Sequence, residues 1–338
     1  MTVTFKPAER RKRKLRMGID GISGSGKSLT GLAILRGVVG PEGRIVAIDS
    51  EKNTLVEYAG IFPGTEQPSG FDLHELNDHS PEAYIDAIDS AVAAGYDGLL
   101  IDSASHEWCG KNGILESVDK AAGDDAYFSK KGWRAATPKH TRFIEKVTGA
   151  PLHVIVTLRV KADMVIEKDA NGKNAPRKVG LQAIQREGFD YEFSILGSMD
   201  SDHVLRVTKS RCLDRGPDGK LLNFLEGAII PCPGIELGEK IREWLNAPPG
   251  VWEAPTYART FVVNDKTIVS GGITKETYVT VANLAGKVDK KHGPGTTRAM
   301  VTGMGAASAA SMNEEQGLDL LQNLNARLSM PSAQSEAK

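Results

Sequence analysis

The residues from Gly21 to Ser28 match the pattern G-x-x-x-x-G-K-[ST] without a mismatch. Glycines let backbone N–H groups close around phosphate oxygens, and a following helix directs the positive end of its dipole toward them. The lysine of the pattern reaches the β- and γ-phosphates, and its last hydroxyl binds Mg²⁺. We therefore expect a site for ATP and Mg²⁺, with these nucleotide ligands: Gly21, Ser23, Gly24, Ser25, Gly26, Lys27, Ser28 and Leu29.

This loop lies between two apolar segments that predict the elements needed to position it. Residues Leu15 to Asp20 predict a buried strand before the loop, and Leu29 to Val39 predict a helix after it. A merely flexible glycine turn is the alternative, but the order strand, loop, helix is the context in which this pattern binds phosphate.

A second apolar segment, Tyr96 to Asp102, predicts a buried strand that ends in a carboxylate. Carboxylate oxygens are ligands that Mg²⁺ prefers, and the carboxyl ends of parallel strands share one edge of a sheet. We expect Asp102 to bind the metal together with Ser28. The alternative is that Asp102 caps the helix that follows.

The base that activates water must come from another segment. Many P-loop ATPases have a catalytic glutamate directly after the metal-binding aspartate, whereas Ser103 follows Asp102 here. The strand predicted over Arg44 to Asp49 leads to Glu51, which we expect just beyond the carboxyl edge of the sheet, beside the phosphate-binding strand. Glu51 is the first candidate for the base. The rivals are Glu107, five residues past Asp102, and an arrangement in which Glu51 is only a surface acid.

The segment Leu152 to Thr157 predicts the next buried strand, after a helix that runs roughly from Pro138 to Gly149. The polar segment Lys161 to Lys178 is long for a loop in a compact domain, which is typical of functional or disordered loops. A β-hairpin with its tip at Asn171-Gly172 is the alternative.

Two segments with alternating polarity, Asp190 to Leu196 and His203 to Arg211, predict a pair of antiparallel strands. The second segment ends in two cations, Lys209 and Arg211. An ordinary solvated strand end is one explanation for this pair.

Several of these segments resemble RecA-type recombinases, in the same order along the chain. Ile48 to Glu51 resembles their strand-end acidic motif, and Leu100 to Ser103 resembles their Walker B strand, in which a serine follows the aspartate. The resemblance implies that Glu51 polarises the attacking water. It also implies that Thr157 or Arg159 senses the γ-phosphate and couples it to a mobile DNA-contacting loop.

The same resemblance implies a role for the two cations at the end of the antiparallel pair. In RecA-like proteins such a pair projects from one subunit into the nucleotide of its neighbour and acts as an arginine finger does. The chain is then expected to form a homo-oligomer, as a ring or a filament. The catalytic residues implied are Lys27, Glu51, Thr157, Lys209 and Arg211.

More narrowly, stretches within residues 5–246 resemble phage-encoded RecA-like ATPases of the single-strand-annealing recombinase group. The resemblance implies single-stranded DNA as the ligand in recombination or annealing, and a single-strand-binding protein as a candidate partner. The stretches are Phe5-Lys6-Pro7-Ala8, the basic run leading to Leu15-Arg16, the phosphate-binding loop, the Trp133 region before Thr137-Pro138-Lys139, and Lys209-Ser210-Arg211.

Two segments have the composition of a nucleic-acid contact. Lys6 to Arg16 contains seven basic residues and the single acid Glu9, which creates a dense local field. Tyr127 to Arg134 interleaves aromatic residues with Lys130 and Lys131, as proteins that bind single strands do. The alternatives are an arm that helps subunits to pack, and aromatic residues that bury against the sheet.

Composition excludes several classes of protein. The 338 residues include 42 basic and 43 acidic ones, so the chain is not a uniformly basic nucleic-acid binder and any polyanion site must be local. No apolar run approaches the ~18 residues of a membrane span, and the N-terminus lacks the apolar stretch of a signal peptide. We expect a cytoplasmic protein with no membrane contact. Cys109, Cys212 and Cys232 are far apart and indicate neither a zinc site nor disulfides.

These patterns predict an α/β protein with a mostly parallel central sheet and a small C-terminal helical module, and the resemblance implies that its P-loop core is RecA-like. The core is followed by Ala247-Pro248-Pro249-Gly250, which breaks a helix, and leucines at helical spacing return from Leu320 to Leu328. The expected parts are a basic arm (1–16), the ATPase domain (17–246), a linker (247–272), the helical module (273–330) and a disordered tail (331–338).

The expected function is ATP hydrolysis by a RecA-like protein that acts on single-stranded DNA in phage-type recombination or annealing. An ATPase that loads or helps a replication or recombination partner is the alternative. A monomeric P-loop kinase for a small metabolite is a third hypothesis, from a different class. Such a kinase needs a lid and an acceptor pocket, and the sequence shows no candidate for either.

Overall fold

The computed structural model describes most of the chain in several stretches. They are residues 13–62, 67–122, 130–168, 174–215, 221–247, 258–263, 266–269, 273, 275–292, 296–304, 306, 309 and 312–329. The predicted basic arm lies outside them except for its last four residues, and so do the tail (331–338), Tyr127 and Phe128.

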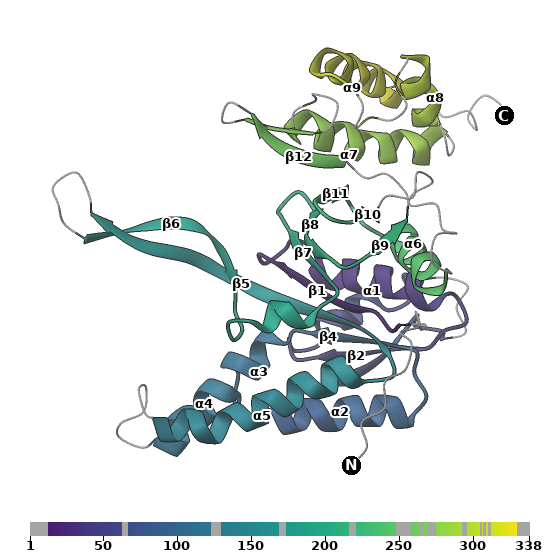
Figure 1. Cartoon of the computed structure of the whole chain (residues 1–338). Helices are drawn as coiled ribbons and strands as arrows, with labels where there is room; N and C mark the ends of the chain where they lie inside the picture. Colours follow the sequence, from purple (N-terminus) through teal and green to yellow (C-terminus); the bar gives the residue numbers. More distant parts are fainter. Residues whose placement is uncertain are drawn as a thin grey trace.

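A mixed β-sheet forms the centre of the molecule, and eleven strands belong to it in the part of the chain that the structure describes (Figure 1). Its first half is parallel throughout, in the spatial order β3-β2-β4-β5-β1-β7. These strands are β1 (Arg16–Gly21), β2 (Ile45–Asp49), β3 (Asp72–Glu75), β4 (Gly98–Asp102), β5 (His153–Lys168) and β7 (Ile195–Met199). The predicted mostly parallel α/β core is therefore confirmed.

The second half of the sheet continues from β7 with antiparallel strands only. They are β8 (Val204–Ser210), β11 (Ala228–Pro231), β12 (Ala258–Val263) and β13 (Lys266–Val269), and a separate small sheet pairs β9 (Leu213–Arg215) with β10 (Leu221–Asn223). Strands β12 and β13 fall within residues 247–272, where we expected a linker without periodicity. Both strands are short, so their alternation is difficult to recognise in the sequence.

Helices cover both faces of the parallel half, which explains why β2 and β4 are buried along their whole length. One face packs against α1 (Lys27–Val39) and α6 (Ile235–Asn246), and the other against α2 (Pro81–Ala93) and α5 (Lys130–Gly149). The contact between α1 and α6 requires glycine, because a Cβ on Gly37 would lie 2.1 Å from the carbonyl oxygen of Ile235. Two shorter helices, α3 (Ser105–Cys109) and α4 (Ile114–Ala122), follow β4.

Helix α5 begins earlier than expected, at Lys130 instead of near Pro138. Proline is common in the first turn of a helix, which is why Pro138 suggested a start. Here Pro138 lies on the exposed side within the helix.

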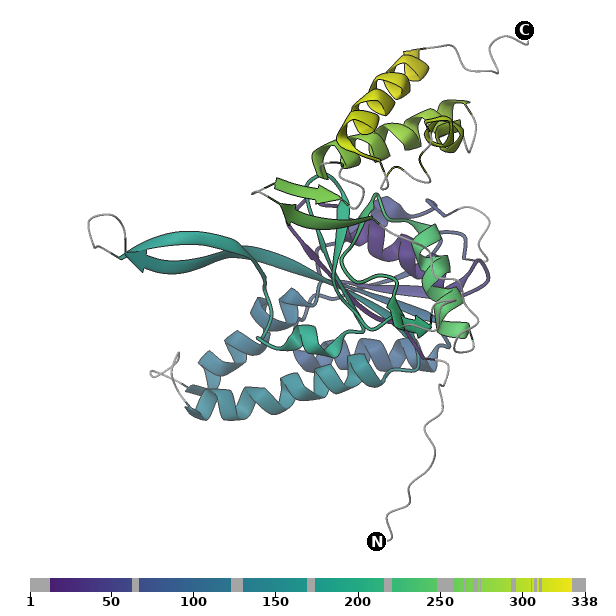
Figure 2. The same ribbon diagram turned by 45° about the horizontal axis from the view of Figure 1, so that its top comes forward.

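The described residues of the segment Lys161 to Lys178 form two antiparallel strands, which favours the alternative of a β-hairpin, and the predicted tip Asn171-Gly172 lies outside the described residues. Strand β6 (Asn174–Ala183) pairs antiparallel with the outer part of β5, up to the pair Lys168 and Asn174. Figures 1 and 2 show this hairpin projecting from the body of the molecule. Because β5 also lies inside the parallel half, one strand runs from the core to the hairpin.

The C-terminal part forms a small helical unit with α7 (Lys275–His292), α8 (Thr296–Gly303) and α9 (Glu314–Ser329). It has a core of its own, which includes Val288, Val301 and Leu324. Val279 of α7 packs against Val204 and Ile229 of the antiparallel half. No helix among the described residues is long and apolar enough to cross a membrane.

The last residue of the predicted basic arm belongs to the core of the fold. Arg16 is the first residue of β1, is buried, and donates hydrogen bonds to the carbonyl oxygens of Thr148 (3.0 Å) and Leu152 (2.7 Å). Its guanidinium is occupied by backbone carbonyls, so Arg16 does not contribute to a nucleic-acid contact as expected.

Candidate active site

The phosphate-binding loop joins the carboxyl end of β1 to the start of α1, as predicted. Gly24 and Gly26 have φ values of 75° and 86°, which favour glycine strongly. A Cβ on Gly21 would lie 2.5 Å from the carbonyl oxygen of Met199. The glycines of the pattern are therefore required by the backbone of the loop itself.

A pocket of about 480 Å³ opens at this loop. It brings together most of the predicted nucleotide ligands with Glu51, Asp102 and Arg159. Its lining consists of Gly21, Ser23, Gly24, Gly26, Lys27, Ser28, Glu51, Thr54, Tyr58, Asp102, Arg159, Val160 and Ile184.

Two of the predicted ligands are placed differently. Ser25 is buried, and its hydroxyl donates to the carbonyl oxygen of Ile22 (2.9 Å), so its side chain stabilises the loop. Leu29 points from the first turn of α1 to the surface and is not among the lining residues.

Lys27 is the cation of the loop, and its Nζ donates to the carbonyl oxygen of Ile22 (2.8 Å). Burial lowers the pKa of Lys27, whereas the carboxylates of Asp102 and Glu51 oppose that shift. Neither carboxylate forms an ion pair with Lys27 in the described part of the chain, so its charge can compensate a phosphate.

The order of the strands explains how the acidic residues reach the pocket. Strand β5 lies between β1 and β4, and β2 lies outside β4. We expected Glu51 to lie beside the phosphate-binding strand. Instead, β4 and β5 separate β2, which leads to Glu51, from β1. The register pairs Asp49 with Asp102, and the backbone turns after β2 so that Glu51 reaches the pocket.

Asp102 ends β4 and is 1% exposed. The hydroxyl of Thr157 donates to its Oδ1, whereas its Oδ2 is buried and has no hydrogen-bond partner among the described residues. Burial raises the pKa of Asp102 to about 6, and hydrogen bonding from Ser28 and Thr157 limits the rise. An unpaired buried carboxylate oxygen beside a serine hydroxyl fits a divalent cation, so Ser28 and Asp102 suit Mg²⁺.

Thr157 was expected as a sensor of the γ-phosphate. It is fully buried, and its hydroxyl is bound to Asp102. Thr157 thus orients the metal-binding carboxylate, and the other candidate at this strand end, Arg159, lines the pocket.

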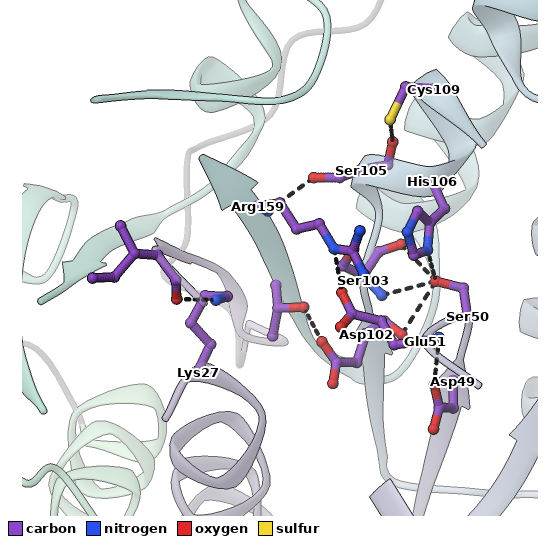
Figure 3. Close-up of polar contacts among 12 residues, drawn as sticks. Lys27, Asp49, Ser50, Glu51, Asp102, Ser103, Ser105, His106, Cys109 and Arg159 are labelled. Atoms are coloured by element: carbon purple, nitrogen blue, oxygen red, sulfur yellow. Dashed lines mark hydrogen bonds and ion pairs between the residues drawn. The ribbon is translucent and has the colours of Figure 1, made fainter. Parts of the chain in front are cut away.

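Glu51 forms an ion pair with Arg159, whose Nε lies 2.7 Å from its Oε1 (Figure 3). Burial tends to raise the pKa of Glu51, but the hydrogen bond and the charge of Arg159 outweigh it and lower the pKa. Asp49 fixes the backbone on both sides of the turn, because its carboxylate accepts the N–H groups of Glu51 (2.6 Å) and Leu55 (3.1 Å).

A network of neutral side chains joins the ends of β2 and β4 beside Glu51 (Figure 3). The Oγ of Ser50 lies 2.8 Å from Nδ1 of His106 and accepts the N–H of Ser103 (3.0 Å). Burial, with the nearby cation of Arg159, lowers the pKa of His106 to about 4, so this ring is neutral. The sequence analysis missed Ser50 and His106 as supports of the site.

Glu107, the rival for the base, lies elsewhere. Its carboxylate is fully buried, faces Nδ1 of His140 at 3.1 Å and accepts a hydrogen bond from Gln185 (3.2 Å). Burial raises its pKa. Glu107 is not among the residues that line the pocket.

The predicted finger residues do not reach this pocket within one copy of the chain. Lys209 donates to the carbonyl oxygen of Asp190 (2.8 Å) and lies over the ring of Tyr191, 5.5 Å from its centroid. Arg211 is exposed and donates to the carbonyl oxygen of Tyr191 (3.4 Å).

The second predicted nucleic-acid segment is divided by the structure. Trp133 is half-buried and packs against Trp108 with 5.8 Å between ring centroids, in a cluster with Ile114 and Val118. Lys131 and Arg134 are exposed on the same helix. Lys131 and Arg134 are thus accessible, whereas Trp133 has a packing role.

The sequence analysis also missed four lining residues: Thr54, Tyr58, Val160 and Ile184. Thr54 and Tyr58 belong to the short 3₁₀ helix η1 (Thr54–Tyr58), and Ile184 follows the hairpin. No local pattern marks these three, because they reach the pocket only through the path of the chain after β2 and β6, whereas Val160 lies in β5 directly after Arg159.

A comparison with protein families finds that a model described as an AAA domain matches residues 13–218, more than half of the chain. A comparison with curated proteins finds no match. The matched range covers the phosphate-binding loop, Glu51, Asp102, Arg159 and Lys209, and it supports the expected nucleotide-binding ATPase domain. The narrower resemblance to phage recombinases stays a prediction. With its P-loop pocket and this match, the chain belongs to the AAA domain family.

Proposed function

We propose that this protein is a Mg²⁺-dependent ATPase in which Glu51 is the base, and that it acts on single-stranded DNA as a homo-oligomer. The observation that carries the hydrolytic part is the meeting of Lys27, Ser28, Asp102 and Glu51 around one pocket. These residues supply, in one place, a phosphate-compensating cation, two metal ligands and a base.

Each residue has a defined part in the proposed reaction. The loop N–H groups and Lys27 hold the phosphates, and Ser28 and Asp102 hold Mg²⁺, which neutralises developing negative charge when it is bound. Glu51 accepts a proton from water as the water oxygen bonds to the γ-phosphorus and the bond to the β-phosphate oxygen breaks. The lowered pKa keeps Glu51 ionised, so its carboxylate can accept a hydrogen bond from the attacking water and orient it.

We further propose that Lys209 and Arg211 complete the site of a neighbouring subunit. Both lie away from the pocket of their own chain and are held at the carbonyl oxygens of Asp190 and Tyr191. Two cations presented in this way suit the charge that builds on a transferred phosphoryl group.

The proposed nucleic-acid contact rests on exposed cations and on the hairpin. Lys131 and Arg134 are exposed on α5, and the β5–β6 hairpin extends from the body. Loading or assisting a replication or recombination partner is the second candidate, and the separate core of α7, α8 and α9 favours it, since such a unit can recruit a protein.

ATP hydrolysis by Asp102→Asn tests the hydrolytic part. We expect the variant to lose turnover by about a hundredfold or more, and to bind Mg²⁺–ATP no better than ATP in a chelator, because an amide replaces an anionic metal ligand. Asp97→Asn is a matched control at the other end of the same strand, where Asp97 accepts the N–H of Arg44. Parental turnover in Asp102→Asn would contradict the proposal.

A further inference from the structure

One carbonyl oxygen of the phosphate-binding loop has a hydrogen-bond partner from a distant part of the chain. The carbonyl oxygen of Ser25 lies 3.0 Å from Nδ1 of His203, in the turn between β7 and β8. A carbonyl oxygen only accepts, so Nδ1 carries a proton and is the donor. His203 is not among the residues that line the pocket. The imidazole therefore holds the loop from outside the nucleotide site.

The backbone that carries the imidazole is held on both sides. His203 has a φ of 58°, and its N–H donates to the carbonyl oxygen of Asp200 (3.2 Å). Its own carbonyl oxygen accepts the N–H of Cys232 (2.9 Å), which follows β11. The next residue, Val204, packs in one cluster with Val279 of α7. The ring thus approaches the loop from a turn that other parts of the chain fix in place.

The contact with His203 sets the direction of one amide of the loop. Ser25 and Gly26 share a trans peptide bond, in which the C=O and the N–H point in opposite directions. Because the carbonyl oxygen is bound to His203, the N–H of Gly26 points away from the imidazole. Gly26 lines the pocket, and its N–H has no hydrogen-bond acceptor among the described residues. This N–H is therefore available to an oxygen atom bound in the pocket.

The imidazole also lies directly against this peptide. A Cβ on Gly26 would lie 3.2 Å from Nδ1 of His203, in a backbone with a φ of 86°. If the peptide rotated, the hydrogen bond to His203 would be lost. The carbonyl oxygen of Ser25 would then turn toward the pocket, where its partial negative charge would repel phosphate oxygens. The contact with His203 therefore opposes the orientation that is unfavourable for an anion.

We propose that His203 is a positioning residue that orients the peptide between Ser25 and Gly26, so that the N–H of Gly26 donates to the diphosphate part of the bound nucleotide. Backbone N–H groups of such a loop surround the α- and β-phosphates. The inference rests on the proposed ATPase function, because it concerns the nucleotide of that site. It assigns to a turn outside the pocket an effect on affinity that ADP and ATP share.

The experiment compares the parent with three substitutions of His203. His203→Gly keeps the positive φ without strain and removes the donor. His203→Asn also tolerates this φ, and its Nδ2 has the same place relative to the backbone as Nδ1 of histidine, so it can donate to Ser25. His203→Asp puts an acceptor at that place and serves if His203→Gly does not fold. Ser201→Ala is the matched control, because Ser201 is exposed in the same turn.

The affinities for ADP and for a non-hydrolysable ATP analogue are measured, together with steady-state hydrolysis, and thermal unfolding verifies that each variant is folded. We expect His203→Gly to bind both nucleotides more weakly by the same factor, about tenfold, because both contain the phosphates that the amide contacts. The KM for ATP should rise by a similar factor while kcat stays near the parental value, because the lost contact is equal in the ground state and the transition state.

The other variants test whether the donor itself is responsible. His203→Asn should recover most of the affinity, and His203→Asp should lose at least as much as His203→Gly. Ser201→Ala should bind both nucleotides as the parent does.

Three results would overturn the inference while the proposed function stands. In the first, the parent hydrolyses ATP and His203→Gly binds both nucleotides as well as the parent. In the second, His203→Asn binds as weakly as His203→Gly, so the donor would not be the cause. In the third, kcat falls and both affinities are unchanged. If the parent bound no ATP, or if Lys27→Ala bound it as well as the parent, the proposed function itself would fail, and the inference with it.

Discussion

The two halves of the central sheet differ in what their strand ends present. In the parallel half, β1, β2 and β4 end at one edge, where β5 leaves the core, and the residues at this edge bring cations and carboxylates into one pocket. In the antiparallel half, strand ends alternate between the two edges, and Lys209 and Arg211 lie apart from that pocket. A parallel arrangement concentrates groups from distant parts of the chain, whereas an antiparallel one distributes them over the surface.

The halves touch at the phosphate-binding loop. His203, in the turn between β7 and β8, has its Nδ1 3.0 Å from the carbonyl oxygen of Ser25. A Cβ on Gly26 would also lie 3.2 Å from that nitrogen. The antiparallel half thus supports the loop without contributing a residue to the pocket lining.

The largest expected effects concern the parallel half. Lys27→Ala should weaken ATP binding by about a hundredfold, because a phosphate-compensating cation is lost. Glu51→Gln should keep binding and lose turnover by about 10²–10⁴-fold, because only the base is removed. Equilibrium binding of a fluorescent ATP analogue and steady-state hydrolysis separate the two variants.

Glu107→Gln is the matched control for Glu51→Gln. The substitution is equally conservative, but the carboxylate of Glu107 faces His140 and not the pocket. Turnover should therefore stay at the parental rate while thermal stability falls. If Glu51→Gln hydrolysed ATP normally and Glu107→Gln did not, the base would be wrongly assigned.

A mixing experiment tests whether the antiparallel half acts on a neighbour. Lys209→Ala/Arg211→Ala should lower turnover by about a hundredfold with little change in ATP affinity. Mixed in equal amounts with Lys27→Ala, it should recover about a quarter of the parental rate per site, since random head-to-tail assembly pairs an intact loop with intact cations at that frequency.

If the double variant were fully active at concentrations where the parent is monomeric, Lys209 and Arg211 would have no part in catalysis. Lys240→Ala, on α6, is the matched control, because its ammonium pairs with Glu243 on the surface. Sedimentation with and without ATP gives the oligomeric state of each mixture.

The smallest effects should separate packing from nucleic-acid binding on α5. Trp133→Ala should lower the free energy of unfolding by about 1–2 kcal/mol and leave the affinity for single-stranded DNA nearly unchanged, because its ring packs on Trp108. Lys131→Glu/Arg134→Glu should weaken DNA binding and reduce its salt dependence. Fluorescence anisotropy of a labelled oligonucleotide measures both.

Trp133→Phe should restore most of the stability lost in Trp133→Ala. If Trp133→Ala remained as stable as the parent and bound the oligonucleotide about tenfold more weakly, its ring would contact a base instead of the protein.

Local patterns were sufficient for the phosphate-binding loop and for Asp102. The positive φ values at Gly24 and Gly26 require glycine, and the binding of phosphate requires the cation of Lys27. Both requirements act within a few residues, so the local sequence is enough to predict the loop. The apolar run before Asp102 likewise predicts both its strand and its place at the strand end.

Neighbours across the sheet were harder to predict, because strand order depends on the packing of the whole chain. Glu51 reaches the pocket although two strands separate β2 from β1. Composition also does not reveal burial. Arg16 and Trp133 are residue types expected in a nucleic-acid contact, yet Arg16 donates to backbone carbonyl oxygens and the ring of Trp133 packs against Trp108. The pair between Glu51 and Arg159 joins residues 108 positions apart.

Strand β5 also has a mechanical consequence. It is one strand from His153 to Lys168, with a shift of its register against β6 between Asp163 and Met164, and Arg159 lies within it at the point where the strand leaves the core. From Arg159 to Lys168 an extended strand covers ~30 Å, at about 3.3 Å per residue. A small rotation of the strand at Arg159 would therefore move the far end of the hairpin by several ångströms. Conversely, a force that acts on the far end of the hairpin would be transmitted along the strand to the pocket.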